Sequence, residues 1–357
     1  MSELLPNDSP RPALRPVLYP TLRDAWPWAR PFTLDRVLER QGFSPGWSAV
    51  LVGILSFLLY AIVSNVIVAV GVVGQFAGAA EAPQMDELMA AMEENAHLVF
   101  GGNAIGQFVG FAFLVWLLAR LHARPWAPFL RLRKPDGPGL LLAVAGWIVL
   151  LPGLFWLASV NSLVPQPEWL AEFEQQQIEL LEGVLFGSDV SGPFLFLTIA
   201  ITPAICEELL FRGYLQRQVE RAGGVVWSIV AVGIAFGLYH LRLTQAIPLA
   251  VLGCYLGYAT WASGSLFTAM LIHLLHNGLQ VIAGVYARDT PDFDPEAVGD
   301  LAVPWYFGVA SIVAAAGVLV AMRRRRAALV GDTPDAEPVD AVPEMAVPSP
   351  DLLSPTP

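Results

Sequence analysis

The chain has 357 residues, of which 55% are hydrophobic and only 14% charged. Soluble globular domains carry about 25% charged residues, so this composition excludes an ordinary soluble domain. The net charge is −11, and no basic stretch is interleaved with aromatic residues, so nucleic acid is not an expected partner. The two cysteines, Cys206 and Cys254, fall inside apolar runs. We expect them to pack as small apolar side chains rather than to form a disulfide or a metal site.

Long apolar runs recur along the chain. A helix that crosses a bilayer needs about 20 predominantly apolar residues, and eight runs meet or approach this length. They predict an all-α fold, a polytopic transmembrane helical bundle of about eight spans. Close helix packing is expected at the GxxxG pairs 106/110, 233/237 and 253/257, because glycine lets helix backbones approach. The spans are expected at 47–72, 97–120, 138–160, 191–215, 224–241, 245–262, 265–286 and 303–322.

The charged residues between these runs are sorted by sign. The stretches 73–96 and 161–190 carry acidic residues and no Lys or Arg, and 287–302 carries five acidic residues and one Arg. Basic residues gather instead around 120–134, 212–221 and 323–326. Loops rich in Lys and Arg stay on the cytoplasmic side of a membrane. The alternation therefore predicts a multi-pass protein of the cell membrane with both termini in the cytoplasm.

Several polar side chains fall inside the apolar runs, where ionisable groups are rare and usually functional. Glu208 and Arg212 are four residues apart, so they share a helix face and can pair. Glu207 points about 100° away from Glu208 and has no basic residue within one turn, which leaves it available as a general base. Pro203 lacks an N–H and so frees the carbonyl of residue 199. The other members of the set are His240, His273, His276 and Asn277.

Counting along the helices predicts that these side chains meet. Glu207 and His240 lie at similar distances on either side of the tight turn 221–224, roughly 22–24 Å from it. His273 and Asn277 share a helix face roughly 12–18 Å beyond the turn 261–265. A single histidine in a span is more often a packing residue, which is our interpretation of His276. Four polar positions on three helices at one depth favour a functional site instead.

A carboxylate, two imidazoles and an amide form a set suited to hydrolysis. Glu207 can activate water and His240 can share the proton, while His273 and Asn277 can donate hydrogen bonds to an oxyanion. Glu207, His240 and His273 could instead hold a zinc ion with one open position. The chain has neither an HExxH nor a GxSxG motif, and the three ligands would come from separate spans. We therefore favour a metal-independent mechanism, with a divalent metal such as zinc as the alternative.

Three motifs follow one another in this region: EELLFR at 207–212, FGLYH at 236–240 and HLLHN at 273–277. In order and spacing they resemble the EExxxR, FxxxH and HxxxN motifs of the CPBP (ABI) family, intramembrane endopeptidases similar to the type II CAAX prenyl protease. The resemblance implies that Glu207 activates the attacking water with His240. It implies that His273 and Asn277 support the oxyanion. The residues that organise the site are then Glu208, Arg212 and Phe236.

The resemblance also implies a substrate, and the apolar runs and charge pattern predict how the rest of the chain is organised. The expected partners are the lipid bilayer and a membrane protein or lipid-anchored peptide, whose peptide bond is cleaved. The alternative is a membrane scaffold or a proton- or ion-coupled transporter that uses the same polar cluster, although no internal repeat of the transporter type is visible. The expected parts are a cytoplasmic Pro- and Arg-rich segment at 1–46, transmembrane helices with acidic external loops at 47–186, the catalytic core at 187–290, the final span at 291–322, and a basic, then acidic and disordered tail at 323–357.

Overall fold

The computed structural model describes residue 38 and residues 42–78, 83–123, 126–186, 189–290 and 303–331. Within these ranges the chain forms helices and no strand, which confirms the predicted all-α fold. The predictions for most of the N-terminal segment 1–46, for the acidic residues at 291–302 and for the tail beyond 331 lie outside the described residues.

Seven helical stretches in the described residues are long and apolar enough to cross a bilayer. They match seven of the predicted spans and make the chain a multi-pass membrane protein. The stretches are Pro45–Phe76, Ala96–His122, Gly137–Asn161, Gly192–Gly223, Leu243–Ser263, Leu266–Asp289 and Trp305–Leu329.

The remaining predicted span, 224–241, is a shorter helix. Helix α12 (Val225–Tyr239) has 15 residues, which gives a length of about 22 Å against a hydrocarbon core of about 30 Å. It ends because Leu241 adopts the left-handed backbone conformation, with φ of 53°, and the chain then enters the short 3₁₀ turn η6 (Leu243–Gln245). The connection after α12 therefore begins before a bilayer would be fully crossed.

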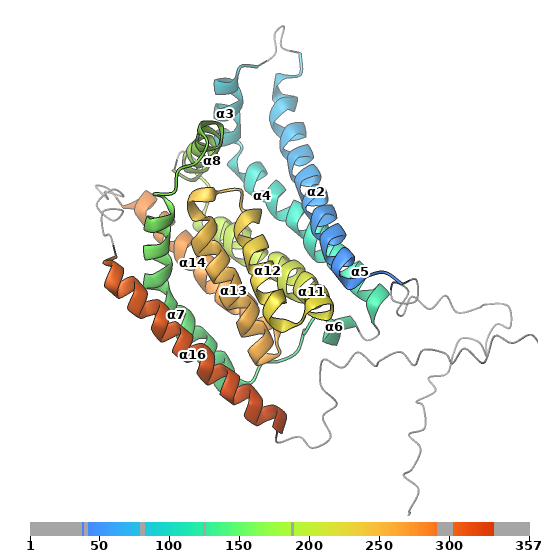
Figure 1. Cartoon of the computed structure of the whole chain (residues 1–357). Helices are drawn as coiled ribbons and strands as arrows, with labels where there is room; N and C mark the ends of the chain where they lie inside the picture. Colours follow the sequence, from blue (N-terminus) through green and yellow to red (C-terminus); the bar gives the residue numbers. More distant parts are fainter. Residues whose placement is uncertain are drawn as a thin grey trace, which may run out of the picture.

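The helices are arranged in pairs around the central stretch Gly192–Gly223 (Figure 1). Helix α2 (Pro45–Val72), extended by η2 (Val73–Phe76), packs along α4 (Ala96–Gln107), which continues through the π-helical turn η3 (Phe108–Phe113) into α5 (Leu114–His122). Helix α7 (Gly137–Asn161) packs along α16 (Trp305–Gly331) on the other side of the bundle. Between them lie α12, α13 (Ala246–Ser263) and α14 (Leu266–Asp289).

The central stretch Gly192–Gly223 is not a regular α-helix throughout. Two π-helical turns interrupt it, one before Pro203 and one after Glu208, and such turns are frequent at functional sites. In chain order the stretch consists of α9 (Gly192–Leu195), η4 (Phe196–Ile201), α10 (Thr202–Glu208), η5 (Leu209–Leu215) and α11 (Gln216–Gly223).

Five of the six GxxxG glycines lie where helix backbones touch, as predicted, and the sixth, Gly257, packs against the side chain of Gln216. A Cβ atom added to Gly110 would lie 2.6 Å from the backbone nitrogen of Tyr60, so α2 sits directly against η3. A Cβ on Gly237 would lie 2.5 Å from the carbonyl oxygen of Ala246. This second contact joins α12 to α13.

The acidic stretches predicted as loops contain helices of their own. Helices α3 (Met85–Glu94) and α8 (Glu168–Phe186) lie together at the end of the bundle reached by the end of α2 (Figure 1). The carboxylate of Glu174 in α8 accepts a hydrogen bond from the Thr244 hydroxyl and lies 3.8 Å from Nε of Arg242. Helix α8 is thereby fixed to the connection that follows α12.

The basic cluster 323–326, predicted at the start of the tail, belongs instead to helix α16. Arg325 donates from Nε to Asp136 at 2.6 Å, and Asp136 also caps α7 by accepting from the backbone N–H of Gly139 at 2.8 Å. The Arg325 hydrogen bond lowers the pKa of Asp136. These contacts join the part of α16 beyond residue 322 to the start of α7. A short helix, α6 (Trp126–Phe129), lies at the same end of the bundle.

The charge pattern and the fold together predict the orientation in the membrane. In a variant with Cys206 and Cys254 replaced by Ala, single cysteines at the exposed positions Glu87 and Arg324 should react with an impermeant maleimide from opposite sides. The acidic α3 should react from outside the cell, because basic residues are retained on the inside. Labelling of both positions from the same side would contradict this topology.

The close contact at Gly110 predicts a sharp difference between two glycine substitutions. Gly110→Ala should lower the thermal unfolding midpoint in detergent, because the new methyl group meets backbone atoms of α2, and such overpacking typically costs about 1–3 kcal/mol. The control is Gly317→Ala on α16, where an added Cβ meets nothing within 4 Å. Equal midpoints for the two variants would show that α2 does not approach η3 this closely.

Candidate active site

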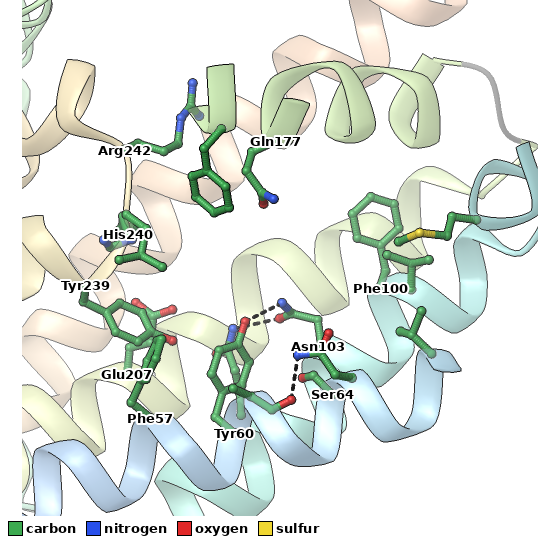
Figure 2. Close-up of a pocket in the computed structure, with 18 residues that line it drawn as sticks. Phe57, Tyr60, Ser64, Phe100, Asn103, Gln177, Glu207, Tyr239, His240 and Arg242 are labelled. Carbon is green, nitrogen blue, oxygen red and sulfur yellow. Dashed lines mark hydrogen bonds between the residues drawn. The ribbon is translucent and has the colours of Figure 1, made fainter. Parts of the chain in front are cut away.

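Glu207 lines a cavity of about 840 Å³. The walls of this cavity come from α2, α4, α8 and the connection after α12. Tyr239 and His240 lie with Glu207 at one end, and Asn103 and Phe100 lie further along the wall (Figure 2). Glu207 itself is only 5% exposed, and its Oε2 atom is buried with no hydrogen-bond partner. A buried carboxylate oxygen without a partner costs folding free energy, so this placement favours a functional role over a structural one.

His240 is held at the end of α12 with one ring nitrogen already used. Its Nδ1 atom lies 2.8 Å from the carbonyl oxygen of Phe236. Since a carbonyl oxygen only accepts, Nδ1 carries the proton, and Nε2 of the neutral ring keeps its lone pair. The ring packs edge-on against Phe236, with 4.9 Å between ring centroids. His240 therefore contributes a fixed basic nitrogen to the wall that Glu207 also lines.

Glu208 is at the centre of a fully buried network behind the cavity. Its Oε1 atom accepts a hydrogen bond from Nη1 of Arg212 at 2.6 Å, the pairing that the i, i+4 spacing predicts. The same oxygen lies 2.8 Å from Nδ1 of His273. Arg212 also donates from Nη2 to the carbonyl oxygen of Gly253 at 3.1 Å, and its guanidinium lies 4.3 Å from the ring centroid of Phe236. The network ties together the central stretch, α12, α13 and α14.

Asn277 stabilises the helix that carries Glu207. Pro203 cannot donate a backbone hydrogen bond to the carbonyl of Ile199, as the sequence predicts. Nδ2 of Asn277 donates to this carbonyl oxygen at 3.1 Å. The amide of α14 therefore replaces the hydrogen bond missing at the turn before Glu207.

The oxyanion role that the resemblance gives to His273 and Asn277 stays a prediction. Neither lines the cavity, and each already makes a hydrogen bond elsewhere. His276 accepts a hydrogen bond from the indole Nε1 of Trp147 at 3.4 Å, in agreement with its interpretation as a packing residue.

The described residues contain no group of three His, Cys, Asp or Glu side chains that could hold a metal ion. Glu207, His240 and His273 do not form such a group in this part of the chain. The zinc alternative stays a prediction that metal analysis of the protein can test.

The sequence analysis did not identify the polar residues that α2 and α4 contribute to the cavity. Tyr60, Ser64, Asn103 and Gln107 all line it. A signal was present, because Asn103 and Gln107 are four residues apart inside the predicted span 97–120, and side-chain amides within a span usually have a hydrogen-bonding role.

One comparison with known proteins gave a match. Residues 189–279 match the family described as Type II CAAX prenyl endopeptidase Rce1-like. No curated protein and no solved structure gave a match. The matched residues contain all three motifs, from Glu207 to Asn277, and the family supports endopeptidase activity of the CAAX protease type in a membrane. Over residues 189–279 the chain is therefore similar to the type II CAAX prenyl endopeptidase family, as its motifs predict.

Proposed function

We propose that the protein is an intramembrane endopeptidase in which Glu207 activates the water that attacks a peptide bond. The observation that carries this proposal is the placement of Glu207: a buried carboxylate, with an oxygen that has no partner, lines a large cavity together with His240. The basic nitrogen of His240 and the carboxylate oxygen of Glu207 are then both available to one water molecule, as general base catalysis requires.

The reaction needs only groups of this chain and water. Glu207, assisted by Nε2 of His240, takes a proton from the water as its oxygen adds to the carbonyl carbon of the scissile bond. The electron pair of the carbonyl moves to its oxygen and forms a tetrahedral oxyanion. When the oxyanion collapses, the C–N bond breaks and the leaving nitrogen takes the proton from Glu207. The products are a carboxylic acid and an amine.

The network behind the cavity explains why the two neighbouring glutamates differ. Glu208 is neutralised by Arg212 at 2.6 Å and is fully buried. Arg212 is held at the same time by Glu208 and by the carbonyl of Gly253. Glu207, one position earlier in the helix, therefore has no guanidinium partner of its own among the described residues, and its carboxylate stays free to accept a proton.

The family name suggests the first substrate class to test. A prenylated cysteine in a C-terminal CaaX sequence anchors a protein at the cytoplasmic surface of a membrane. The cavity offers polar groups near Glu207 and apolar side chains such as Val68, Val99 and Phe100 further along. We propose a membrane-associated or lipid-anchored peptide as the substrate, with both termini of the chain in the cytoplasm.

Substitution of the two glutamates should separate catalysis from stability. Glu207→Gln should lower the cleavage rate of a prenylated CaaX peptide carrying a fluorophore and a quencher by at least about 10²-fold, because it removes the base. Its unfolding midpoint should stay close to that of the wild type. Glu208→Gln should also lower the midpoint, since breaking a buried ion pair typically costs about 3–5 kcal/mol. If both variants lost activity without a thermal shift, this division of roles would be wrong.

Metal dependence should be decided by analysis of active protein. We expect activity to survive exhaustive chelation, with a pH–rate profile that His240→Ala displaces, because a Glu–His pair can activate water without a metal. Elemental analysis of the same preparation gives the zinc content. Stoichiometric zinc whose removal and return switch activity off and on would establish the zinc alternative instead.

Natural substrates should be sought in the membrane itself. Comparative membrane proteomics of cells with the wild type and with Glu207→Gln should reveal uncleaved proteins that accumulate only with the variant. Identical peptide termini in both samples would argue for a scaffold or transporter role.

A further inference from the structure

Arg242 is the one Lys or Arg among the described residues that line the cavity. It follows His240 by two residues on the connection after α12, and Figure 2 shows His240 between Arg242 and Glu207. Apolar side chains such as Phe57 and Phe173 line the same cavity. A charge placed beside apolar walls is normally paired and hydrogen-bonded. The mechanism above gives Arg242 no role.

The guanidinium of Arg242 has an ion-pair partner but no hydrogen bond among the described residues. Its Nε atom lies 3.8 Å from Oε1 of Glu174 and is buried with no hydrogen-bond partner, and 3.8 Å is beyond the length of an N–H···O bond, about 2.7–3.2 Å. Glu174 accepts its hydrogen bonds from the hydroxyl and the backbone N–H of Thr244 instead. Glu174 therefore stabilises the positive charge of Arg242, and the described residues leave the N–H donors of the guanidinium unused.

Unused guanidinium donors in a cavity are suited to a carboxylate ligand. A guanidinium is planar, and its fork of N–H groups matches the two oxygens of a carboxylate. Such charge-assisted pairs are roughly twice as strong as hydrogen bonds between neutral groups. The side chain of Arg242 is 29% exposed, so a ligand in the cavity can reach it. A peptide substrate carries a carboxylate at its C-terminus or on an Asp or Glu side chain.

Chain geometry limits how far this carboxylate can lie from the scissile bond. His240 and Arg242 are two residues apart, so their Cα atoms are at most about 7 Å from each other. Three residues of an extended peptide span about 10–11 Å. A peptide whose scissile bond lies at Glu207 and His240 can therefore extend past His240 and reach Arg242 within about three residues.

We propose that Arg242 binds a carboxylate of the substrate that lies within about three residues of the scissile bond. Glu174 and Thr244 are positioning residues, because they hold the guanidinium at the cavity wall. A C-terminal CaaX sequence meets the requirement, since its chain end lies only about three residues after the prenylated cysteine. The inference rests on the proposed endopeptidase activity and adds a rule for which bonds are cleaved.

Two pairs of peptides test the inference and identify the source of the carboxylate. All four are prenylated CaaX peptides with the fluorophore and the quencher on side chains. The first pair ends in a free carboxylate or in a carboxamide. The second pair ends in a carboxamide and carries Glu or Gln next to the last residue. In at least one pair, the wild type should cleave the carboxylate member with a kcat/KM about 10–10²-fold higher, the usual contribution of hydrogen bonds to a charged group.

Arg242→Gln should bring this ratio close to one, because a neutral amide no longer distinguishes a carboxylate from a carboxamide. The ratio is measured within one variant, so it does not depend on the fraction of folded protein. The matched control is Arg288→Gln, since Arg288 donates to the carbonyl oxygen of Val190 at 2.8 Å and does not line the cavity. This control should keep the wild-type ratio. A wild-type ratio near one in both pairs, or an undiminished ratio in Arg242→Gln, would overturn the role of Arg242.

The glutamate variant separates failure of the inference from failure of the proposed function. Cleavage that Glu207→Gln leaves intact, or no cleavage of any of the four peptides by the wild type, would overturn both. Cleavage that depends on Glu207 but ignores the carboxylate would overturn the role of Arg242 alone.

Discussion

The ion pair between Glu208 and Arg212 is the interaction on which the site depends. Both side chains are completely buried, and inside a bilayer water cannot solvate either charge. His273 and the carbonyl of Gly253 stabilise the pair by adding one hydrogen bond to each of its members. These partners come from α14 and α13. Burial of the pair with these partners therefore requires the bundle to close around the central stretch, and that closure brings Glu207 to the cavity wall.

The irregular backbone near Glu207 is stabilised in the same way. Pro203 leaves the carbonyl of Ile199 without its helical partner, and a lone carbonyl in hydrocarbon would cost several kcal/mol. Asn277 supplies the missing donor. At the end of α12, Leu241 takes a left-handed conformation, which ends the helix where His240 meets the cavity. Non-glycine residues adopt this conformation at a cost, so the packing around it must compensate.

The spans and the Glu208–Arg212 pair could be predicted because both follow from local patterns: length of an apolar run and i, i+4 spacing. Helix α3 was not predicted, because its acidic composition suggested a loop, although in the structure Glu87 accepts from the backbone N–H of Gln84 in a capping box. The contribution of Tyr60 and Asn103 to the cavity could not be predicted. Gly106 and Gly110 show that a helix face is closely packed, and no local pattern says that the partner is α2.

The packing of α2 against the helix that carries Gly106 and Gly110 has a consequence for how the site is built. The residues from 189 to 279 carry the carboxylates and histidines, yet most of the cavity wall comes from α2, α4 and α8, outside that range. A carboxylate and an imidazole in hydrocarbon can activate water only where a polar cavity admits it, and Tyr60, Ser64 and Asn103 provide that polarity. Their amide and hydroxyl groups cost less to bury than charges would. The N-terminal helices thus supply the polar half of the cavity without adding charges that would compete with Glu207 for its proton.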